Sequence, residues 1–300
     1  MKLTFVVLTS FYPASQQALE YADALSHAVH GRLLLLHAKR VSFFDPYIFA
    51  GEAWHQQELK QEVDTKALLD RRVQQLHSPA TLEMVTDLLP DLARDLAKKH
   101  QPALFVLGRP GPEKISFEHL SPVAMELLRV VQLPMLLVPL GAPVPAVPQR
   151  VLIAADDEDF ALGDTHDAVH RLLTGLRAEL TVAHVTPLED DASCARALHA
   201  VQHSGLTSGL PVPTLRGYQA ELPAEGVLAA VRDTKADLVV VLARTRSYLG
   251  ELFHKSVTAQ VIKHSPVPVL VVPAKAPAPA PQQRVGTQHG SDDIRLWPTV

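Results

Sequence analysis

Short apolar runs alternate with amphipathic stretches along most of the chain. Residues 14–29 repeat apolar side chains at helical spacing, with Ala18, Ala22 and Leu25 on one face, and residues 52–76 form a longer helical pattern with charges on its outer face. Between such stretches lie short runs rich in leucine and valine. We expect strands near residues 3–8, 32–37, 81–86, 103–107 and 134–139, and again near 150–155, 179–185, 212–217, 237–242 and 268–272.

The expected strands are apolar on both faces, and helical patterns separate them. This arrangement is typical of a parallel sheet that is covered by helices on both sides. The sequence therefore predicts an α/β fold made of two tandem Rossmann-like units. Each unit has a five-stranded, mainly parallel sheet, whose last strand lies at the edge or runs in the opposite direction. Ligands of such folds bind beyond the carboxyl ends of the strands.

An internal duplication relates the two halves of the chain. "LPMLLVP" (133–139) matches "VPVLVVP" (267–273) at an offset of 134 residues, and "GRLLLLHA" (31–38) aligns with "AELTVAHV" (178–185), which places His37 opposite His184. We interpret both histidines as packed residues or residues of the ligand-binding edge, not as catalytic bases. The predicted organisation is a first domain over 1–140, a Pro-rich linker over 141–149, a second domain over 150–273 and a disordered tail over 274–300.

Composition narrows the functional classes. The chain has 300 residues, a formal net charge of −4 and a single cysteine, Cys194, so it has no intrachain disulfide and no overall positive charge to attract nucleic acid. No segment approaches the ~20 apolar residues of a membrane span. We expect a cytoplasmic protein that binds neither nucleic acid nor membrane.

Several motifs resemble the universal stress protein family in its tandem two-domain form. They are Thr9-Ser10-Phe11 after the first strand, the closing segment "LFHKSVTAQVIKHSPVPVLVVP" (252–273), and the duplication itself. The resemblance implies an adenine nucleotide alpha hydrolase-like fold and a role in the stress response. It also implies that the last strands of the two units pair, which gives an intrachain pseudo-dimer and allows a homodimer. In one subclass it implies ATP binding through a G-x2-G-x9-G-[ST] loop and an aspartate after the first strand.

The first half keeps part of that nucleotide motif. Gly108 and Gly111 match the first two glycines, whereas Ser121 stands at the third glycine and Ser10 at the aspartate. The segment is either a weakened phosphate loop, helped by Arg109, or an ordinary turn after a strand. The candidate binding residues of this half are Thr9, Ser10, Gly108, Arg109, Gly111 and Ser121.

The second half keeps the complementary part. Asp156 is present, but Leu242, Thr245 and Lys255 occupy the three glycine positions, while Ser256 retains the hydroxyl. The alternative to a nucleotide site is that Ser256 caps its helix and the acidic run is a solvated loop. The candidate residues of this half are Asp156, Thr245, Lys255, Ser256 and Thr258. Neither half carries a complete site, so we expect no required cofactor, and ATP or ADP only as a weak ligand.

Two other groups of residues allow different chemistry. Phe43, Phe44 and Tyr47 follow the second strand and either line a small-molecule pocket or join the core. His166 and His170, and likewise His199 and His203, have the four-residue spacing of metal ligands. We interpret both pairs as surface-helix residues and expect no metal site.

The sequence favours a non-catalytic stress-response protein that acts as a regulatory or interaction module toward an unknown protein partner. Two alternatives stay open. One is an ATP-binding protein with slow hydrolysis that uses Gly108 and Gly111. The other is a small-molecule carrier that uses the aromatic loop at residues 43–49. No nucleophile or acid–base group assembles from the sequence, so we expect no enzyme activity beyond, at most, weak ATP hydrolysis.

Overall fold

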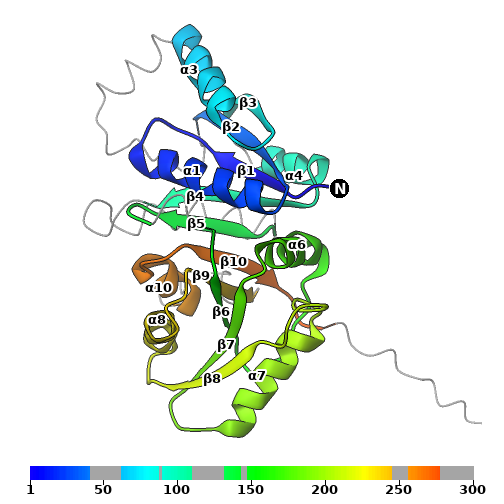
Figure 1. The fold of residues 1–300 in the computed structure, drawn as a ribbon, viewed down its shortest axis with the longest axis vertical. Coiled ribbons are helices and arrows are strands. Elements are labelled where there is room, and N and C mark those ends of the chain that lie inside the picture. The colour runs from blue at the N-terminus through cyan, green and yellow to red at the C-terminus, as the bar shows by residue number, and fades with distance from the viewer. Residues whose placement is uncertain (41–61, 88–89, 110–131, 143–146, 245–255, 278–300) are drawn as a thin grey trace, which may run out of the picture.

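A computed structural model describes residues 1–40, 62–87, 90–109, 132–142, 147–244 and 256–277. These residues form one ten-stranded sheet in the order β3-β2-β1-β4-β5-β10-β9-β6-β7-β8, with helices on both faces (Figure 1). The strands are the ten that the apolar runs predict. The α/β, Rossmann-like fold class is therefore confirmed.

The two halves repeat the same order of elements. The first contains β1 (Thr4–Leu8), α1 (Pro13–Ala28), β2 (Arg32–Arg40), α3 (Glu62–Gln75), β3 (Ala80–Asp87), α4 (Pro90–Lys99), β4 (Ala103–Arg109) and β5 (Met135–Pro139). The second contains β6 (Arg150–Ala154), the 3-10 turn η1 (Gly163–Thr165), α6 (His166–Leu176), β7 (Glu179–Thr186), α7 (Asp191–His203), β8 (Thr214–Gln219), α8 (Pro223–Asp233), β9 (Leu238–Arg244), α10 (Val257–His264) and β10 (Val269–Ala274). Residues 52–61 of the long predicted helix lie outside the described residues.

The last strands of the two halves join the sheets. β5 runs parallel to β4, and β10 runs parallel to β9, but β5 and β10 pair antiparallel, with Leu136 opposite Leu270. Each last strand therefore lies at the edge of its own five-stranded sheet and keeps the direction of its neighbours there. The change of direction falls between the halves.

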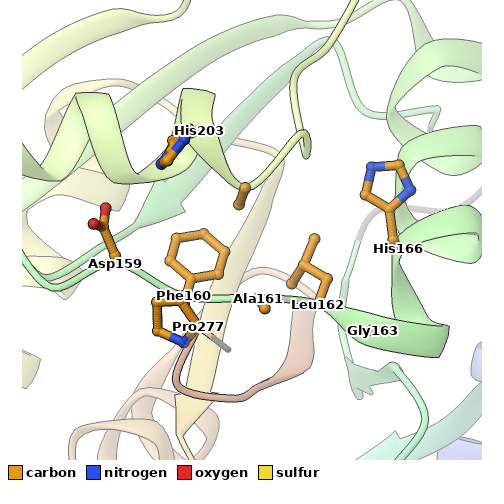
Figure 2. A pocket seen from close by; sticks show the side chains of 9 residues that line it. Asp159, Phe160, Ala161, Leu162, Gly163, His166, His203 and Pro277 are labelled. Carbon is orange, nitrogen blue, oxygen red and sulfur yellow. The ribbon is translucent and has the colours of Figure 1, made fainter. Parts of the chain in front are cut away.

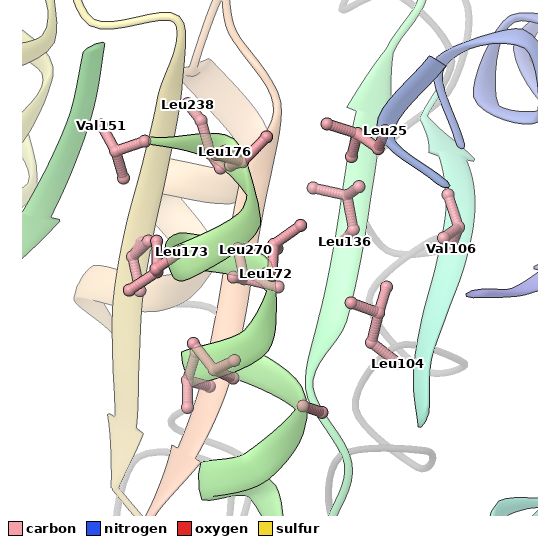
Figure 3. Packing of buried hydrophobic residues seen from close by; sticks show 14 of the residues in the cluster. Leu25, Leu104, Val106, Leu136, Val151, Leu172, Leu173, Leu176, Leu238 and Leu270 are labelled. Atoms are coloured by element: carbon pink, nitrogen blue, oxygen red, sulfur yellow. The ribbon is translucent and has the colours of Figure 1, made fainter. Parts of the chain in front are cut away.

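Two apolar cores lie on opposite faces of this sheet, and each extends through both halves. On one face α1 and α6 pack against the central strands, as Figure 3 shows for Leu25, Leu136, Leu173 and Leu270. On the other face α4, α8 and α10 bury a second set of side chains. Both cores are continuous across the β5–β10 junction. Burial of apolar surface therefore holds the halves together in addition to the strand pairing.

The last strand extends past residue 273, the expected end of the second domain. Ala274 is the last residue of β10, and Lys275 exchanges two backbone hydrogen bonds of 2.9 Å with Ala161. The reason is that β9 continues to Arg244, which gives β10 a partner beyond Pro273. Residues 278–300 lie outside the described part of the chain. Among the described helices, none is both long enough and apolar enough to span a bilayer.

Candidate functional site

The candidate residues are distributed over two edges of the sheet, one in each half. In the first half, β1 and β4 are neighbours and end beside each other. In the second half, β6 and β9 have the same relation. The residues that follow these four strands therefore lie where parallel sheets bind ligands.

Thr9 and His37 are packed into the first-half edge. Thr9 is buried, and its carbonyl lies 3.1 Å from Nδ1 of the buried His37 ring. The second half repeats this contact, because Nδ1 of His184 lies 2.9 Å from the carbonyl of Ala155. Both histidines are buried and lie in the C-terminal halves of their strands, which agrees with the interpretation of them as packed residues or residues of the ligand-binding edge.

Ser10 lies in a closed turn before α1. Its backbone N–H donates to Oγ of Ser15 at 2.8 Å, and Ser15 in turn donates to the carbonyl of Leu8. Arg72 reaches over from α3, donates to the Ser10 carbonyl at 3.2 Å, and places its guanidinium 5.3 Å from the centre of the Phe11 ring. The guanidinium of Arg72 therefore contacts the backbone of the residue at which the resemblance implies an aspartate.

Gly108 is explained by packing. A Cβ atom at this position would lie 2.1 Å from the carbonyl oxygen of Ala14 and 2.8 Å from the backbone nitrogen of Ser15. Only glycine lets β4 approach the first turn of α1 this closely. The residue at the equivalent register position in the second half is Leu242.

Arg109 would assist a phosphate in one of the two interpretations of this segment, and its side chain points to the other half instead. Its side chain is buried and crosses to the other half, where Nη1 donates to the carbonyl of Lys263 at 3.0 Å and Nη2 to that of Ser265 at 2.6 Å. Burial lowers the pKa of this guanidinium below its ordinary value. The carbonyls at the C-terminal end of α10 carry partial negative charge, so Arg109 stabilises the junction of the halves instead of facing a ligand.

Asp156 forms an ion pair with the largely buried Arg244 in the second half. Nε of Arg244 donates to its carboxylate at 2.8 Å, and Nη2 contacts the other carboxylate oxygen. The Arg244 side chain is 10% exposed, whereas that of Asp156 is 45% exposed. The same guanidinium donates to the backbone carbonyls of Glu158 at 2.6 Å and Asp159 at 3.1 Å. Arg244 therefore holds the whole acidic loop against the end of β9.

A second arginine fixes the outer side of this loop. Nη2 of Arg196, on α7, lies 2.7 Å from the carboxylate of Asp157. The hydrogen bond from Arg196 lowers the pKa of Asp157, and the same bond raises the pKa of Arg196. The acidic run, interpreted from the sequence as a solvated loop, is thus ordered by two ion pairs.

Ser256 caps α10. Its side chain accepts a hydrogen bond of 3.1 Å from the backbone N–H of Ala259, and its backbone is extended, as N-cap residues are. The helix-capping interpretation of Ser256 is confirmed. Thr258 is buried under the same turn.

Several candidates lie outside the described residues. These are Phe43, Phe44, Tyr47, Gly111, Ser121, Thr245 and Lys255.

The sequence did not identify Arg72 as part of an edge, or the side chain of Arg244 as the partner of Asp156. For Arg244, the signal was a basic residue at the end of β9, next to the strand β6 that is followed by four acidic residues. The sequence also gave no indication of a cavity of about 380 Å³ beside the acidic loop, which Figure 2 shows between Asp159, His203, His166 and Pro277.

Together these features define an α/β protein of two repeated halves, each with one edge where strand ends and loop residues meet. The family model of the universal stress proteins matches residues 2–139 and 220–273. The chain belongs to the universal stress protein family. No curated protein sequence matches it.

Solved structures show the same fold at low sequence identity. A universal stress protein from Archaeoglobus fulgidus DSM 4304 is 16% identical, with a TM-score of 0.64 over 90% of this chain and 98% of the other. A putative universal stress protein from Pseudomonas aeruginosa UCBPP-PA14 is 14% identical, with a TM-score of 0.52 over 90% of this chain and 93% of the other. The cytoplasmic domain of a prokaryotic cation chloride cotransporter is 10% identical, with a TM-score of 0.50 over 92% of this chain and 95% of the other.

Proposed function

We propose that this universal stress protein is a non-catalytic regulatory or interaction module of the cytoplasm that does not retain nucleotide. The observation that carries the proposal is the Asp156–Arg244 ion pair. Asp156 is the residue that the family motif assigns to the adenosine end of a nucleotide, and here its carboxylate is bound by a guanidinium of the same chain. A nucleotide would have to displace that guanidinium.

The surroundings of the ion pair support the same conclusion. Arg244 donates to the backbone of Glu158 and Asp159 as well as to Asp156, so moving it disrupts several hydrogen bonds at once. Leu242 places a side chain where the phosphate loop requires bare backbone. The acidic run adds negative charge beside any bound phosphate, which opposes binding.

In the first half, two of the residues that suggested a phosphate loop, Gly108 and Arg109, have structural roles. Gly108 is required by the approach of α1, and Nη1 and Nη2 of Arg109 donate to carbonyls at the C-terminal end of α10. The carboxylate of the family motif is replaced by Ser10, whose backbone is bound within its own turn. Support for tight nucleotide binding is therefore weak in both halves.

The test is native mass spectrometry of the full chain, purified without added nucleotide and then repeated with ATP and Mg²⁺. We expect the mass of the bare chain in both spectra. An ATP or ADP adduct would overturn the proposal. The variants Asp156→Asn and Gly111→Val would then assign the adduct to the second or the first half.

An adduct of another mass would also overturn the proposal as stated, and would favour the small-molecule carrier. The matched variants for that outcome are Phe44→Ala and Tyr47→Ala in the aromatic loop. Loss of the adduct in these two, with retention in Asp156→Asn, would identify the loop as its binding site.

A further inference from the structure

One group of side chains among the described residues has the composition and spacing of a metal site. It consists of Asp159, His199 and His203, all of them exposed, and one ligand atom from each lies within 4.8 Å of the other two. His199 and His203 are one turn apart on α7, with ring centres 5.4 Å apart. Asp159 comes from the loop after β6, and its carboxylate points toward the helix that carries His203 (Figure 2).

The distances suit a first-row transition metal. Ligand bonds of about 2.0–2.2 Å in tetrahedral geometry place the ligand atoms roughly 3.3–3.6 Å apart. Small rotations of three exposed side chains close the remaining distance. Within the described part of the chain, neither imidazole ring and neither oxygen of the Asp159 carboxylate has a hydrogen bond that such a rotation would break.

The backbone that carries Asp159 is already fixed. Arg244 donates to the Asp159 carbonyl, and the next side chain, Phe160, is 4% exposed and anchored in the core. Further back along the loop, Asp157 is paired with Arg196, which lies on the same helix as the two histidines. Because the loop is attached to α7 on one side and to β9 on the other, binding a metal orders only side chains.

The electrostatic surroundings favour a cation. The loop carries four carboxylates, from Asp156, Asp157, Glu158 and Asp159, opposite the two guanidinium groups of Arg196 and Arg244. His203 is also the last residue of α7, where the helix carbonyls carry partial negative charge.

We propose that Asp159, His199 and His203 form a binding site for a divalent transition metal of the zinc class. Two imidazole nitrogens with one carboxylate suit Zn²⁺, Ni²⁺ or Cu²⁺, whereas Mg²⁺ and Ca²⁺ prefer oxygen ligands alone. Three protein ligands leave one position open for water or a small ligand. Asp159 and His203 also line the cavity of about 380 Å³ described above. This site is independent of the nucleotide question.

The test is a titration of the full chain with Zn²⁺ in competition with a chromophoric chelator. We expect the affinity for Zn²⁺ to fall at least about tenfold in Asp159→Asn, His199→Gln and His203→Gln, since even loss of a group that supports a ligand costs that much. Mg²⁺ should not compete. The unfolding midpoints of the variants should match the wild type, because all three side chains are exposed.

The chain contains a matched control. His166 and His170 on α6 have the same spacing, and their rings stack at 5.3 Å, but their Nε2 atoms face the carbonyls of Gly205 and Ser208. His170→Gln should bind Zn²⁺ like the wild type. An equal loss in His170→Gln and Asp159→Asn, or an undiminished affinity in Asp159→Asn, would overturn the proposal, as would equal affinity for Mg²⁺.

Discussion

The loops that follow the first strand of each half occupy equivalent places and are built differently. In the first half, four residues separate β1 from α1, and the loop closes on itself through Ser10 and Ser15. In the second half, the loop between β6 and η1 is twice as long and carries four acidic residues. An arginine binds each loop, but Arg72 comes from α3 and Arg244 from the end of β9.

Loop length explains why one half has a glycine, Gly108, where the other half has Leu242. The short first-half loop brings the start of α1 onto β4, so that Gly108 meets the backbone of Ala14. The longer second-half loop starts its helix further on, and Leu242 occupies the equivalent strand position. A glycine that matches a phosphate-loop motif can thus be required by helix packing alone.

The largest expected effect is that of Gly108→Ala. Because its new Cβ would collide with backbone at 2.1 Å, α1 must shift, and we expect a loss of about 3 kcal/mol in the free energy of unfolding. Chemical denaturation measures it. The control is Leu242→Met at the equivalent position, which should cost less than about 1.5 kcal/mol. Equal stability of Gly108→Ala and the wild type would show that the close approach does not constrain this position.

Arg109→Ala is expected to have the next largest effect. It leaves the carbonyls of Lys263 and Ser265 without their donor at the junction of the halves, and should cost about 2 kcal/mol. Arg109→Lys should lose less, because the lysine ammonium can still donate to one of the two carbonyls. Denaturant unfolding measures both. If Arg109→Ala keeps wild-type stability but loses an ATP adduct seen in the wild type, Arg109 binds phosphate and does not stabilise the junction.

The halves also differ in how the first helix holds the turn before the third strand. In the first half, the carboxylate of Asp23 accepts from the backbone N–H groups of His77 and Ser78, each at 2.9 Å. In the second half, the ring of His170 lies 2.8 Å from the carbonyl of Ser208. The first arrangement needs a charged acceptor and is therefore sensitive to acid.

Asp23→Asn should cost about 1.5 kcal/mol at neutral pH. Burial on its own raises the pKa of Asp23, but hydrogen bonds from His77 and Ser78 outweigh burial and lower it. The carboxylate therefore stabilises the fold above its unfolded pKa of about 4, and this contribution disappears as the pH falls through the lower folded value. Unfolding midpoints between neutral and acidic pH should converge for wild type and variant. A constant difference down to the lowest pH would contradict this.

The sequence was sufficient for the fold because strands that are apolar on both faces, such as residues 104–107 and 238–241, leave few alternatives to a covered parallel sheet. The contacts at the two edges could not be predicted in the same way. Asp156 and Arg244 are 88 residues apart, and no periodic pattern connects them. The histidine spacing on α7 was visible in the sequence, but Asp159 joins it only through the tertiary structure.

The smallest expected effect is that of substitutions at Ser256, whose hydroxyl could cap a helix or bind a ligand. Ser256→Ala removes the N-cap of α10 and should cost about 1 kcal/mol, whereas Ser256→Asp keeps an acceptor for the Ala259 N–H and should retain wild-type stability. Thermal unfolding of the three proteins measures the difference. The aspartate would also repel a phosphate at this helix end. A stable Ser256→Asp protein that loses an ATP adduct present in the wild type would therefore show that the second half still binds nucleotide. Ser256 would then both cap α10 and bind the ligand.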